Sequence, residues 1–375
     1  MSNSMTVTVE KSLSNYPNLP FVTVTVCAPG TSTCDTIDHV LLDTGSTGLR
    51  VLASKLSSTT LAGMSREQLS SSGYYIDECS QFVSGYTWGS VRLADVELGS
   101  ETASSVPIEV IADSAAGSAP SSCASAGTNM GTVSQLGAYG ILGVQGQIRD
   151  CGQSCASSAL PLYYACSGGS GCSTESAVPL TQQVTNPVSM LTNDNNGIVL
   201  SMPSVSDSGQ ASATGTLYLG VGTQSDNTLT SLSTIALDAN FEFTATYGGT
   251  ANQYSFIDSG TNFLYFQDSS LTQCTGTYSG YYCPSSVQTE SVTFAPNSGA
   301  SSSSGSYTGT FKVGNVNTLL SSSGVYAFND IGVYGLVEDG LDFGMPFFYG
   351  RYVVITNESS SGAGDASAAF GSNGA

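Results

Sequence analysis

The feature that most constrains this chain is a short motif that occurs twice, each time directly after an apolar segment. Leu41-Leu42 leads into Asp43-Thr44-Gly45-Ser46, and Phe256-Ile257 leads into Asp258-Ser259-Gly260-Thr261. Farther along the chain, each copy is followed by a second apolar segment that ends in glycine, Ile141-Leu142-Gly143 and Leu341-Asp342-Phe343-Gly344. One such copy is an ordinary turn sequence. Two copies with matching companions indicate two related halves that form one site.

The two aspartates predict a pair of carboxyl groups. A strand that ends in such a turn presents its aspartate at the end, and glycine lets another backbone segment approach closely. Two carboxyl groups within a few Å do not ionise together readily, so one keeps its proton under acid conditions. Such a pair can deprotonate a water molecule and protonate a carbonyl oxygen. It needs no metal, cofactor or histidine.

Charge and histidine content exclude other classes of function. The 375 residues include 28 Asp and Glu but only 8 Lys and Arg, for a net charge of −20. The chain therefore lacks the basic stripe that nucleic-acid binding requires. The single histidine, His39, excludes multi-histidine metal sites. His39 stands shortly before Asp43, where strand alternation would place both on one face, but we expect a structural role because a carboxyl pair needs no histidine.

The hydrophobic pattern is typical of a mainly β protein. Hydrophobic residues make up 40 % of the chain, which is enough for a core. Helical signals are few, and the clearest, Ser65-Arg66-Glu67-Gln68, predicts one or two turns. No stretch approaches the roughly 18 apolar residues of a membrane-spanning helix. The length predicts two lobes, and period-two alternation predicts strands at 21–26, 40–42, 91–98, 106–111, 216–221 and 352–355.

The ten cysteines indicate an oxidising compartment. Local spacing favours five disulfides, namely Cys27–Cys34, Cys151–Cys155, Cys166–Cys172, Cys274–Cys283 and, with the remaining two residues, Cys79–Cys123. The alternative is a zinc site with the ligands Cys151, Cys155, Cys166 and Cys172, and the sequence does not prove the connectivity. The segment Met1-Ser2-Asn3-Ser4 lacks the character of a signal peptide. We therefore expect a secreted, periplasmic or cell-surface protein whose targeting segment has been removed.

These segments together resemble the pepsin-like aspartic peptidases. The blocks Val40–Leu49 and Phe256–Thr261 resemble the signatures of the two lobes of that family, and Gly140–Gly143 is similar to the segment that completes the first. Thr216–Gly220 resembles the strand between the lobes, and Phe343–Val354 resembles the closing segment of the second lobe. The resemblance covers roughly residues 15–357. It extends to a bacterial branch of the family.

The resemblance implies a bilobal pepsin-like acid protease fold, with two β-barrel lobes of the six-stranded type, a cleft between them and few short helices. The Asn-, Asp- and Ser-rich region just past the middle is the expected boundary between the lobes. The implied division begins with an N-terminal strand or extension at 1–14 and an N-terminal lobe at 15–192, which contains the first aspartate loop and a flap. A linker with a strand follows at 193–222. The C-terminal lobe with the second aspartate loop spans 223–357, and a disordered tail spans 358–375.

The same resemblance implies roles for the motif residues, with Asp43 and Asp258 as the catalytic pair. The other motif positions would support this pair. Thr44 and Ser259 would place a hydroxyl beneath each loop, and Gly45 and Gly260 would place a backbone amide beside the carboxyl groups. The hydroxyls of Ser46 and Thr261 would bind the outer carboxylate oxygens.

The sequence departs from the family pattern at the substrate pocket. Arg50 stands where the family usually has tryptophan, and a cation there would stabilise the carboxylates. A hairpin tip at 84–89 predicts a flap, with Tyr86 as the residue that closes over substrate and Phe82 or Trp88 as alternatives. Ordinary packing beneath the hairpin is the competing interpretation of these aromatic residues.

We therefore predict an exported aspartic endopeptidase, a monomer without a cofactor that binds a polypeptide in extended conformation. The alternative is a pepsin-like scaffold with weak or no proteolysis that acts as a surface binding protein, a hypothesis motivated by Arg50 and the uncertain flap. A glycosidase also uses two carboxyl groups, but sugar clefts usually contain more tryptophan than the single one here. A structural adhesin would show regular repeats, and none is visible.

Overall fold

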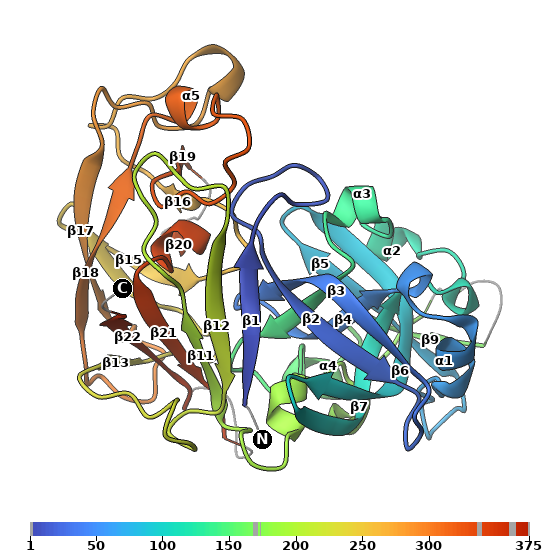
Figure 1. The fold of residues 1–375 in the computed structure, drawn as a ribbon. Coiled ribbons are helices and arrows are strands. Elements are labelled where there is room, and N and C mark those ends of the chain that lie inside the picture. The colour runs from blue at the N-terminus through green and yellow to red at the C-terminus, as the bar shows by residue number, and fades with distance from the viewer. Residues whose placement is uncertain (1–2, 168–171, 173, 336–339, 360–364, 374–375) are drawn as a thin grey trace.

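The computed structural model describes residues 3–167, 172, 174–335, 340–359 and 365–373 (Figure 1). Two lobes built of strands lie side by side around a central sheet. The described helices are short: α1 (Ser58–Gly63), α2 (Ser121–Ala124), α3 (Val133–Leu136), α4 (Gly152–Ser157) and α5 (Val316–Leu319). Single 3₁₀ turns occur at Ala53–Lys55, Ser114–Ala116, Leu180–Gln182, Pro187–Met190, Gly276–Tyr278 and Met345–Phe347. The expected mainly β, bilobal fold with few short helices is confirmed.

Six strands of the N-terminal lobe close into a barrel. They follow the order β2, β3, β8, β4, β7, β6, and β6 pairs again with β2. Their bounds are Pro20–Cys27, Cys34–Asp43, Gly140–Val144, Thr47–Leu52, Glu101–Ile111 and Gly85–Leu98. Three further strands extend the sheet beyond β6, namely β5 (Tyr75–Phe82), β9 (Tyr163–Cys166) and β10 (Thr174–Glu175). Closure leaves the six barrel strands without a free edge.

The C-terminal lobe is a separate seven-stranded sheet. Its order is β18, β17, β14, β15, β20, β16, β19, with the bounds Tyr307–Val313, Gln288–Ala295, Phe243–Tyr247, Thr250–Ile257, Asp342–Phe343, Leu264–Phe266 and Gly332–Tyr334. Phenylalanines fill its interior, and the ring centroids of Phe243 and Phe294 lie 4.6 Å apart. Phe343 packs against both rings, so the strand pair β15–β20 is anchored in this core.

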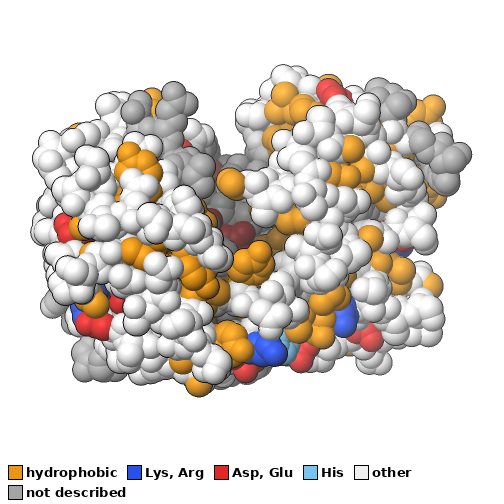
Figure 2. Space-filling view, turned by 90° about the horizontal axis from the view of Figure 1, so that it is seen from above, with side chains coloured by type: hydrophobic (Ala, Val, Ile, Leu, Met, Phe, Trp, Pro, Cys, Tyr) orange, Lys and Arg blue, Asp and Glu red, His pale blue; other side chains and the backbone are white. Residues whose placement is uncertain are grey.

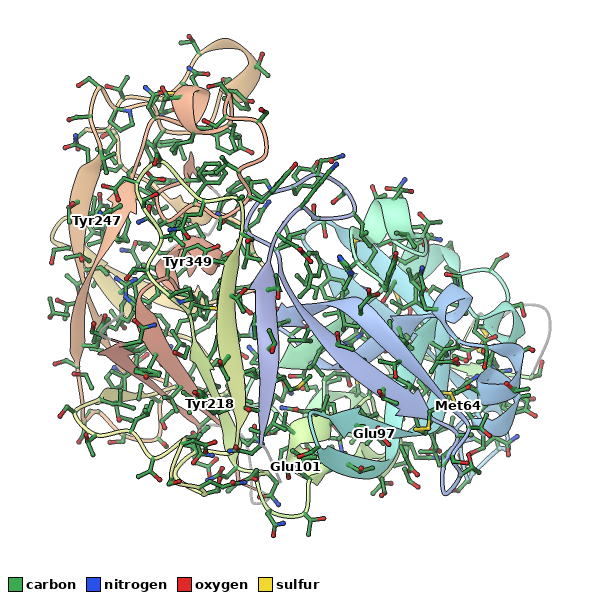
Figure 3. The ribbon with its side chains drawn as sticks, in the orientation of Figure 1. Met64, Glu97, Glu101, Tyr218, Tyr247 and Tyr349 are labelled. Carbon is green, nitrogen blue, oxygen red and sulfur yellow. A yellow bond between two sulfur atoms is a disulfide. The ribbon has the colours of Figure 1, made fainter. Side chains whose placement is uncertain are left out.

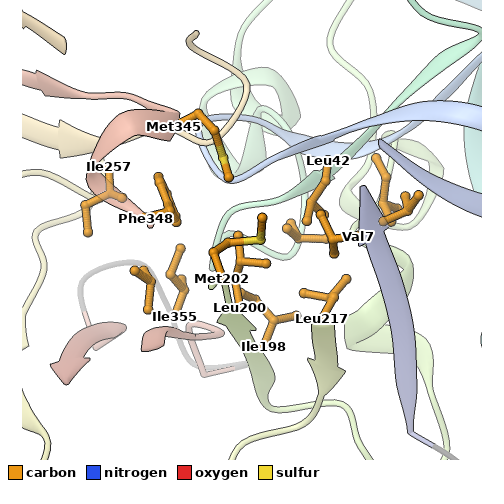
Figure 4. Packing of buried hydrophobic residues seen from close by; sticks show 14 of the residues in the cluster. Val7, Leu42, Ile198, Leu200, Met202, Leu217, Ile257, Met345, Phe348 and Ile355 are labelled. Carbon is orange, nitrogen blue, oxygen red and sulfur yellow. The ribbon is translucent and has the colours of Figure 1, made fainter. Parts of the chain in front are cut away.

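A central sheet joins the two lobes. It continues from β2 through β1, β12, β11, β21, β22 and β13, with the bounds Ser4–Val9, Ala213–Leu219, Gly197–Ser201, Arg351–Thr356, Ser367–Ser372 and Ser233–Ala236. Figure 4 shows side chains from strands of both lobes gathered into one buried cluster, among them Val7, Leu42, Leu200, Leu217, Ile257 and Ile355. The lobes therefore share a continuous hydrophobic core, and the strands that carry both aspartate loops contribute to it.

A buried asparagine before β2 ties the N-terminal segment to the C-terminal lobe. The side-chain amide of Asn18 donates to the carbonyl oxygens of Asn262 at 3.1 Å and Phe328 at 3.0 Å. Its oxygen accepts from the Phe328 amide at 2.8 Å and from the Tyr349 hydroxyl at 3.1 Å. Figure 3 labels Tyr349 inside the C-terminal lobe. All four polar contacts cross between the two halves of the chain.

The expected disordered tail is wrong where the structure describes it. β22 pairs with β21 on one side and β13 on the other, and Ala368 and Phe370 are buried. The Phe370 ring lies 4.7 Å from that of Tyr307. The small polar residues around it suggested disorder, but the central sheet offers two strand edges that this segment completes. Residues 360–364 and 374–375 of the predicted tail lie outside the described residues.

The helical turn expected at residues 65–68 is also wrong. Arg66 and Gln68 instead form isolated β-bridges with Arg92 and Tyr75. The guanidinium of Arg66 makes an ion pair with buried Asp77 at 2.6 Å, which holds the segment in an extended conformation along the sheet.

The ten cysteines form the five expected disulfides, Cys27–Cys34, Cys79–Cys123, Cys151–Cys155, Cys166–Cys172 and Cys274–Cys283. The four residues of the alternative zinc site are divided between two of these bonds, so that alternative is wrong. Among the described residues, no helix is long and apolar enough to cross a membrane.

Candidate active site

Each aspartate loop is held by a parallel strand pair. β3 ends at Asp43 and pairs in parallel with β8, where Asp43 faces Gly143. β15 ends next to Asp258 and pairs in parallel with β20, where Ile257 faces Phe343. The two apolar segments that follow the motifs in the sequence are therefore the strands that support the loops.

Each carboxyl group lies against the glycine of the opposite loop. A Cβ atom added to Gly45 would lie 2.5 Å from Cγ of Asp258, and one added to Gly260 would lie 2.8 Å from Cγ of Asp43. Real Cβ atoms do not approach other atoms this closely. Both motif positions therefore require glycine, because any side chain would push the opposite carboxyl away.

The two loops bind their own carboxyl groups in the same way. Asp43 accepts the Gly45 amide at 2.8 Å through Oδ1 and the Ser46 hydroxyl at 2.5 Å through Oδ2. In the second loop, the motif glycine donates to Oδ1 of Asp258 at 2.7 Å and the Thr261 hydroxyl donates to Oδ2 at 2.8 Å. These contacts place both carboxyl groups in fixed orientations.

Beneath the carboxyl groups, four hydrogen bonds join the loops. Thr44 and Ser259 each donate a backbone amide to the hydroxyl of the other. The Thr44 hydroxyl donates to the Ile257 carbonyl at 3.2 Å, and the Ser259 hydroxyl donates to the Leu42 carbonyl at 2.7 Å. All four residues that make these bonds lie at or just beyond the ends of β3 and β15, so the two lobes are in register at this point.

The two carboxyl groups are electrostatically coupled, and Asp258 is half-buried. Asp43 is only 6 % exposed. Burial, followed by the negative charge of Asp43 and a hydrogen bond with it, raises the pKa of Asp258 well above its ordinary value. Two close carboxyl groups of this kind retain one proton at a pH where isolated aspartates are ionised.

The pair lies at the floor of a cleft between the lobes. Figure 2 shows this hollow from above, with acidic side chains at its floor. The cleft consists of two adjoining cavities of about 400 and 350 Å³. Both cavities are lined by Asp43, Phe82, Val83, Phe256, Asp258, Thr261 and Asp342.

The β5–β6 hairpin covers this cleft with Phe82 and Val83, which line both cavities. The expected closing residue, Tyr86, does not line either cavity. Its backbone pairs with residues 128–130, and its buried side chain packs with Trp88 and the Cys79–Cys123 disulfide. Of the three aromatic residues proposed from the sequence, Phe82 is the one that faces the aspartates.

Arg50 is buried in a network of carboxyl groups. Its guanidinium lies 2.6 Å from Glu78, 3.3 Å from Glu109 and 3.2 Å from Asp150. Burial lowers the pKa of the Arg50 guanidinium, but the charges of these three carboxyl groups outweigh burial and raise it. Arg50 lines the larger cavity, yet its ion-pair partners are these three groups and not the aspartate pair that the sequence suggested.

His39 does not line the cleft cavities. The pairing of β2 with β3 is irregular near this residue, and His39 has a φ of 48°. This break in the strand overturns the simple alternation that would have put His39 on the face of Asp43. The imidazole instead contacts the rings of Phe21 and Tyr139 and lies 3.3 Å from Asp38.

Three acidic residues of the cleft were missed by the sequence analysis. Asp342, Glu78 and Asp150 line the larger cavity with the aspartate pair, and Asp342 lines both cavities. Asp342 had a signal, because it interrupts the apolar segment Leu341–Gly344 that supports the second loop. Glu78 and Asp150 carried no such pattern.

The described residues offer two clusters with the spacing of metal ligands, Cys27–Cys34 with Glu97 and Cys166–Cys172 with Asp77. In each cluster both cysteines are joined in a disulfide. Disulfide sulfurs are not the thiolates that bind metals, so neither cluster carries a metal assignment.

Comparison with known proteins agrees with this fold. The crystal structure of the aspartic proteinase from Irpex lacteus aligns with a TM-score of 0.54 and 16 % sequence identity, over 99 % of this chain and 97 % of that chain. At this identity the likeness shows the pepsin-like fold alone. A family model described as "Protein of unknown function (DUF3443)" matches residues 1–370. No curated protein matches the sequence significantly.

Proposed function

The chain belongs to the DUF3443 family, and we propose that it is an aspartic endopeptidase that uses Asp43 and Asp258. The observation that carries this proposal is the reciprocal placement of the two carboxyl groups, each against the glycine of the opposite loop. Hydrogen bonds within each loop orient both carboxyl groups, and both groups line the cleft. The fold of the aspartic proteinase from Irpex lacteus is consistent with this function.

The two carboxyl groups have different roles in this proposal. Asp258 holds the shared proton, because burial and the charge of Asp43 raise its pKa. Asp43 takes a proton from water as the water oxygen bonds to the scissile carbonyl carbon. Asp258 gives its proton to the carbonyl oxygen. When the C–N bond breaks, Asp43 gives the proton it took from water to the leaving amine. The hydroxyl formed from the carbonyl oxygen gives its proton back to Asp258.

The substrate of this proposal is an extended polypeptide that lies in the cleft beneath Phe82 and Val83. Both aspartates come from one chain, so a monomer is sufficient for activity. Five disulfides support an exported protein, and we extend the proposal to a secreted, periplasmic or cell-surface location. The assignment of residues 193–222 as the linker and strand between the two lobes is part of the same proposal.

The test is hydrolysis of an unfolded protein by the purified chain at acid pH. Asp43→Asn and Asp258→Asn keep the size of the side chains and should each abolish cleavage, together with binding of pepstatin. Asp38→Asn, at an exposed aspartate of β3, is the matched control and should cleave normally. Undiminished cleavage by either active-site variant would refute the proposal.

A second candidate is a peptide-binding scaffold without hydrolysis. The observation in its favour is the flap, where the side chain of Tyr86 packs away from the aspartates. A folded wild-type chain that binds extended peptides but leaves them intact across the whole acid range would support this candidate instead.

A further inference from the structure

The two cavities beside the aspartate pair differ in chemical character. The smaller cavity has apolar walls, formed by Leu41, Met130, Leu136, Ile141, Phe256 and Tyr265. The larger cavity is acidic, with walls that include Arg50, Glu78, Gln81, Gln145, Asp150 and Asp342. A ligand that spans both cavities therefore meets an apolar wall in the smaller cavity and Glu78 and Asp150 in the larger one, and Asp342 borders both.

Asp342 is the carboxyl group of the larger cavity whose strand pairs with the strand that carries the second aspartate loop. In the parallel pairing of β15 with β20, Asp342 faces Phe256, two positions before Asp258. Because side chains alternate along a strand, Phe256 and Asp258 lie on one face, and all three residues line both cavities. Tyr265 faces Asp342 on its other side, in β16.

The buried carboxyl group of Asp342 lowers the stability of the fold. It is 8 % exposed, and its Oδ1 atom has no hydrogen-bond partner. Burial, and then the charge of Asp258, raise the pKa of Asp342 well above its ordinary value. A buried carboxyl oxygen without a partner destabilises a protein, and no contact within the described residues offsets it with a positive charge. Such a group in a cleft indicates a functional role.

The wall of the larger cavity also has more carboxyl groups than cations. Arg50 is shared among Glu78, Glu109 and Asp150, and Glu78 is only 1 % exposed. Burial and then the charge of Glu78 raise the pKa of Asp150 well above its ordinary value. One guanidinium therefore serves these three carboxyl groups, and Asp342 has no ion-pair partner among the described residues, so a positively charged ligand would favour the ionised form of Asp342.

We propose that the acidic cavity binds a lysine or arginine side chain of the substrate and that Asp342 is the residue that recognises its charge. The neighbouring residue of the substrate then places an apolar side chain in the smaller cavity, because successive side chains of an extended peptide point to opposite sides. The preferred cleavage site has one basic and one apolar residue on its two sides. This inference rests on the proposed peptidase function and deepens it.

The test compares quenched fluorescent peptides that differ at one residue. One pair has Phe-Lys and Phe-Leu at the cleavage site, and a second pair has the reverse orders Lys-Phe and Leu-Phe. For the wild type, kcat/KM should be roughly 10-fold or more higher for the lysine peptide in one of the two orders, because the ammonium group favours the ionised form of Asp342 and forms a charge-assisted hydrogen bond with it. In Asp342→Asn this preference should fall to about 2-fold or less.

Two further variants keep this test decisive. Asp342→Leu removes the buried polar group altogether, so it reports on the preference even where the asparagine variant folds poorly, and it should favour the leucine peptide. Asp38→Asn, at an exposed carboxyl outside the cleft, should keep the wild-type preference. A lysine preference that persists in both Asp342 variants, or a wild type that shows none in either order, overturns the proposal.

A binding experiment separates this inference from the peptidase function. Peptides in which a hydroxyethylene group replaces the bond between Phe and Lys, or between Phe and Leu, are titrated into the wild type by calorimetry. Tighter binding of the lysine peptide, lost in Asp342→Asn, supports the acidic subsite even if no peptide is hydrolysed. Hydrolysis with equal binding of both peptides refutes the subsite and leaves the peptidase proposal standing.

Discussion

Thr44 and Ser259, from the two halves of the chain, bind each other reciprocally. The Thr44 amide donates to Oγ of Ser259 at 3.1 Å, and the Ser259 amide donates to Oγ1 of Thr44 at 2.9 Å. Both residues are buried, and each directly follows an aspartate of the pair. The distance between the two carboxyl groups therefore depends on contacts made one residue away from them.

Thr44→Val should weaken this connection. The substitution keeps the shape of the side chain but leaves the buried Ser259 amide without its acceptor, which should lower the free energy of unfolding by about 1–3 kcal/mol. It should also lower kcat, because the two loops lose their register. Urea unfolding and peptide hydrolysis measure the two effects. Thr293→Val, at an exposed Thr–Thr pair, is the control, and an unchanged kcat in Thr44→Val would contradict the prediction.

Gly260→Ala should disable the site through the opposite loop. The added methyl group would lie 2.8 Å from Cγ of Asp43, so the carboxyl must move. Displacement of a reacting group by about 1 Å costs roughly 100-fold in rate, and we expect a loss of kcat/KM of at least this size. The control is Gly299→Ala, whose added methyl group would lie 3.2 Å from its nearest neighbour, Cβ of Asp238. This variant should retain activity. Similar activities of the two variants would argue against a close carboxyl pair.

Phe82→Ala should impair closure of the flap. Phe82 lines both cavities, so its loss should raise KM and reduce kcat/KM by roughly 10-fold through lost apolar contact and poorer exclusion of water. Tyr86→Phe is the control, because Tyr86 packs into the other face of the hairpin. Steady-state kinetics decide between the two residues. A larger effect of the Tyr86 variant would return the closing role to Tyr86.

Arg50→Met should destabilise the N-terminal lobe. It leaves Glu78, Glu109 and Asp150 without their shared cation, and breaking a buried ion pair in this way costs about 3–5 kcal/mol at neutral pH. The cost should be smaller in acid, where protonation neutralises the carboxyl groups. Unfolding at both pH values measures it. Lys312→Met, which removes an exposed ion pair with Asp207, should cost less than about 1 kcal/mol.

Asp330 should make the fold more stable in acid than at alkaline pH. Its carboxyl group is fully buried and neither oxygen has a hydrogen-bond partner. Burial, and then the charge of Asp207, raise the pKa of Asp330 from 3.8 to about 7. Between these two pH values the folded chain keeps a proton that the unfolded chain has released, so stability falls as the pH rises through this window.

Asp330→Asn should flatten this dependence. The wild type should show a lower midpoint of unfolding by urea at pH 8 than at pH 5, and the variant should show a smaller difference. An equally steep dependence in the variant would assign the effect to other buried acids, such as Asp77, whose pKa is raised by burial to about 6.

The features that were predictable from the sequence are those with local causes. Alternation of apolar residues identified the strands at 91–98 and 106–111, which lie within β6 and β7. Short spacings identified four of the five disulfides, and the last pair followed from the two cysteines that remained. The two aspartate motifs were recognisable because each loop needs its aspartate, hydroxyls and glycine within four consecutive residues.

The features that were not predictable depend on residues far apart in the chain. Phe82 faces the aspartates instead of Tyr86 because the backbone of Tyr86 is held by residues 128–130. The tail forms β22 because β13 and β21 both offer an edge to it. Composition carries no information about either contact.

Neighbouring residues therefore encode the two equivalent loops, the β fold and the framework of disulfides, which is why these features were predictable. The surroundings of the aspartate pair depend on how the chain folds in three dimensions. The tertiary structure places Arg50 among three carboxyl groups and Asp342 beside the second loop. Burial and charge depend on the side chains that surround a residue in space, and the lobes bring these together from segments more distant than any local pattern reaches.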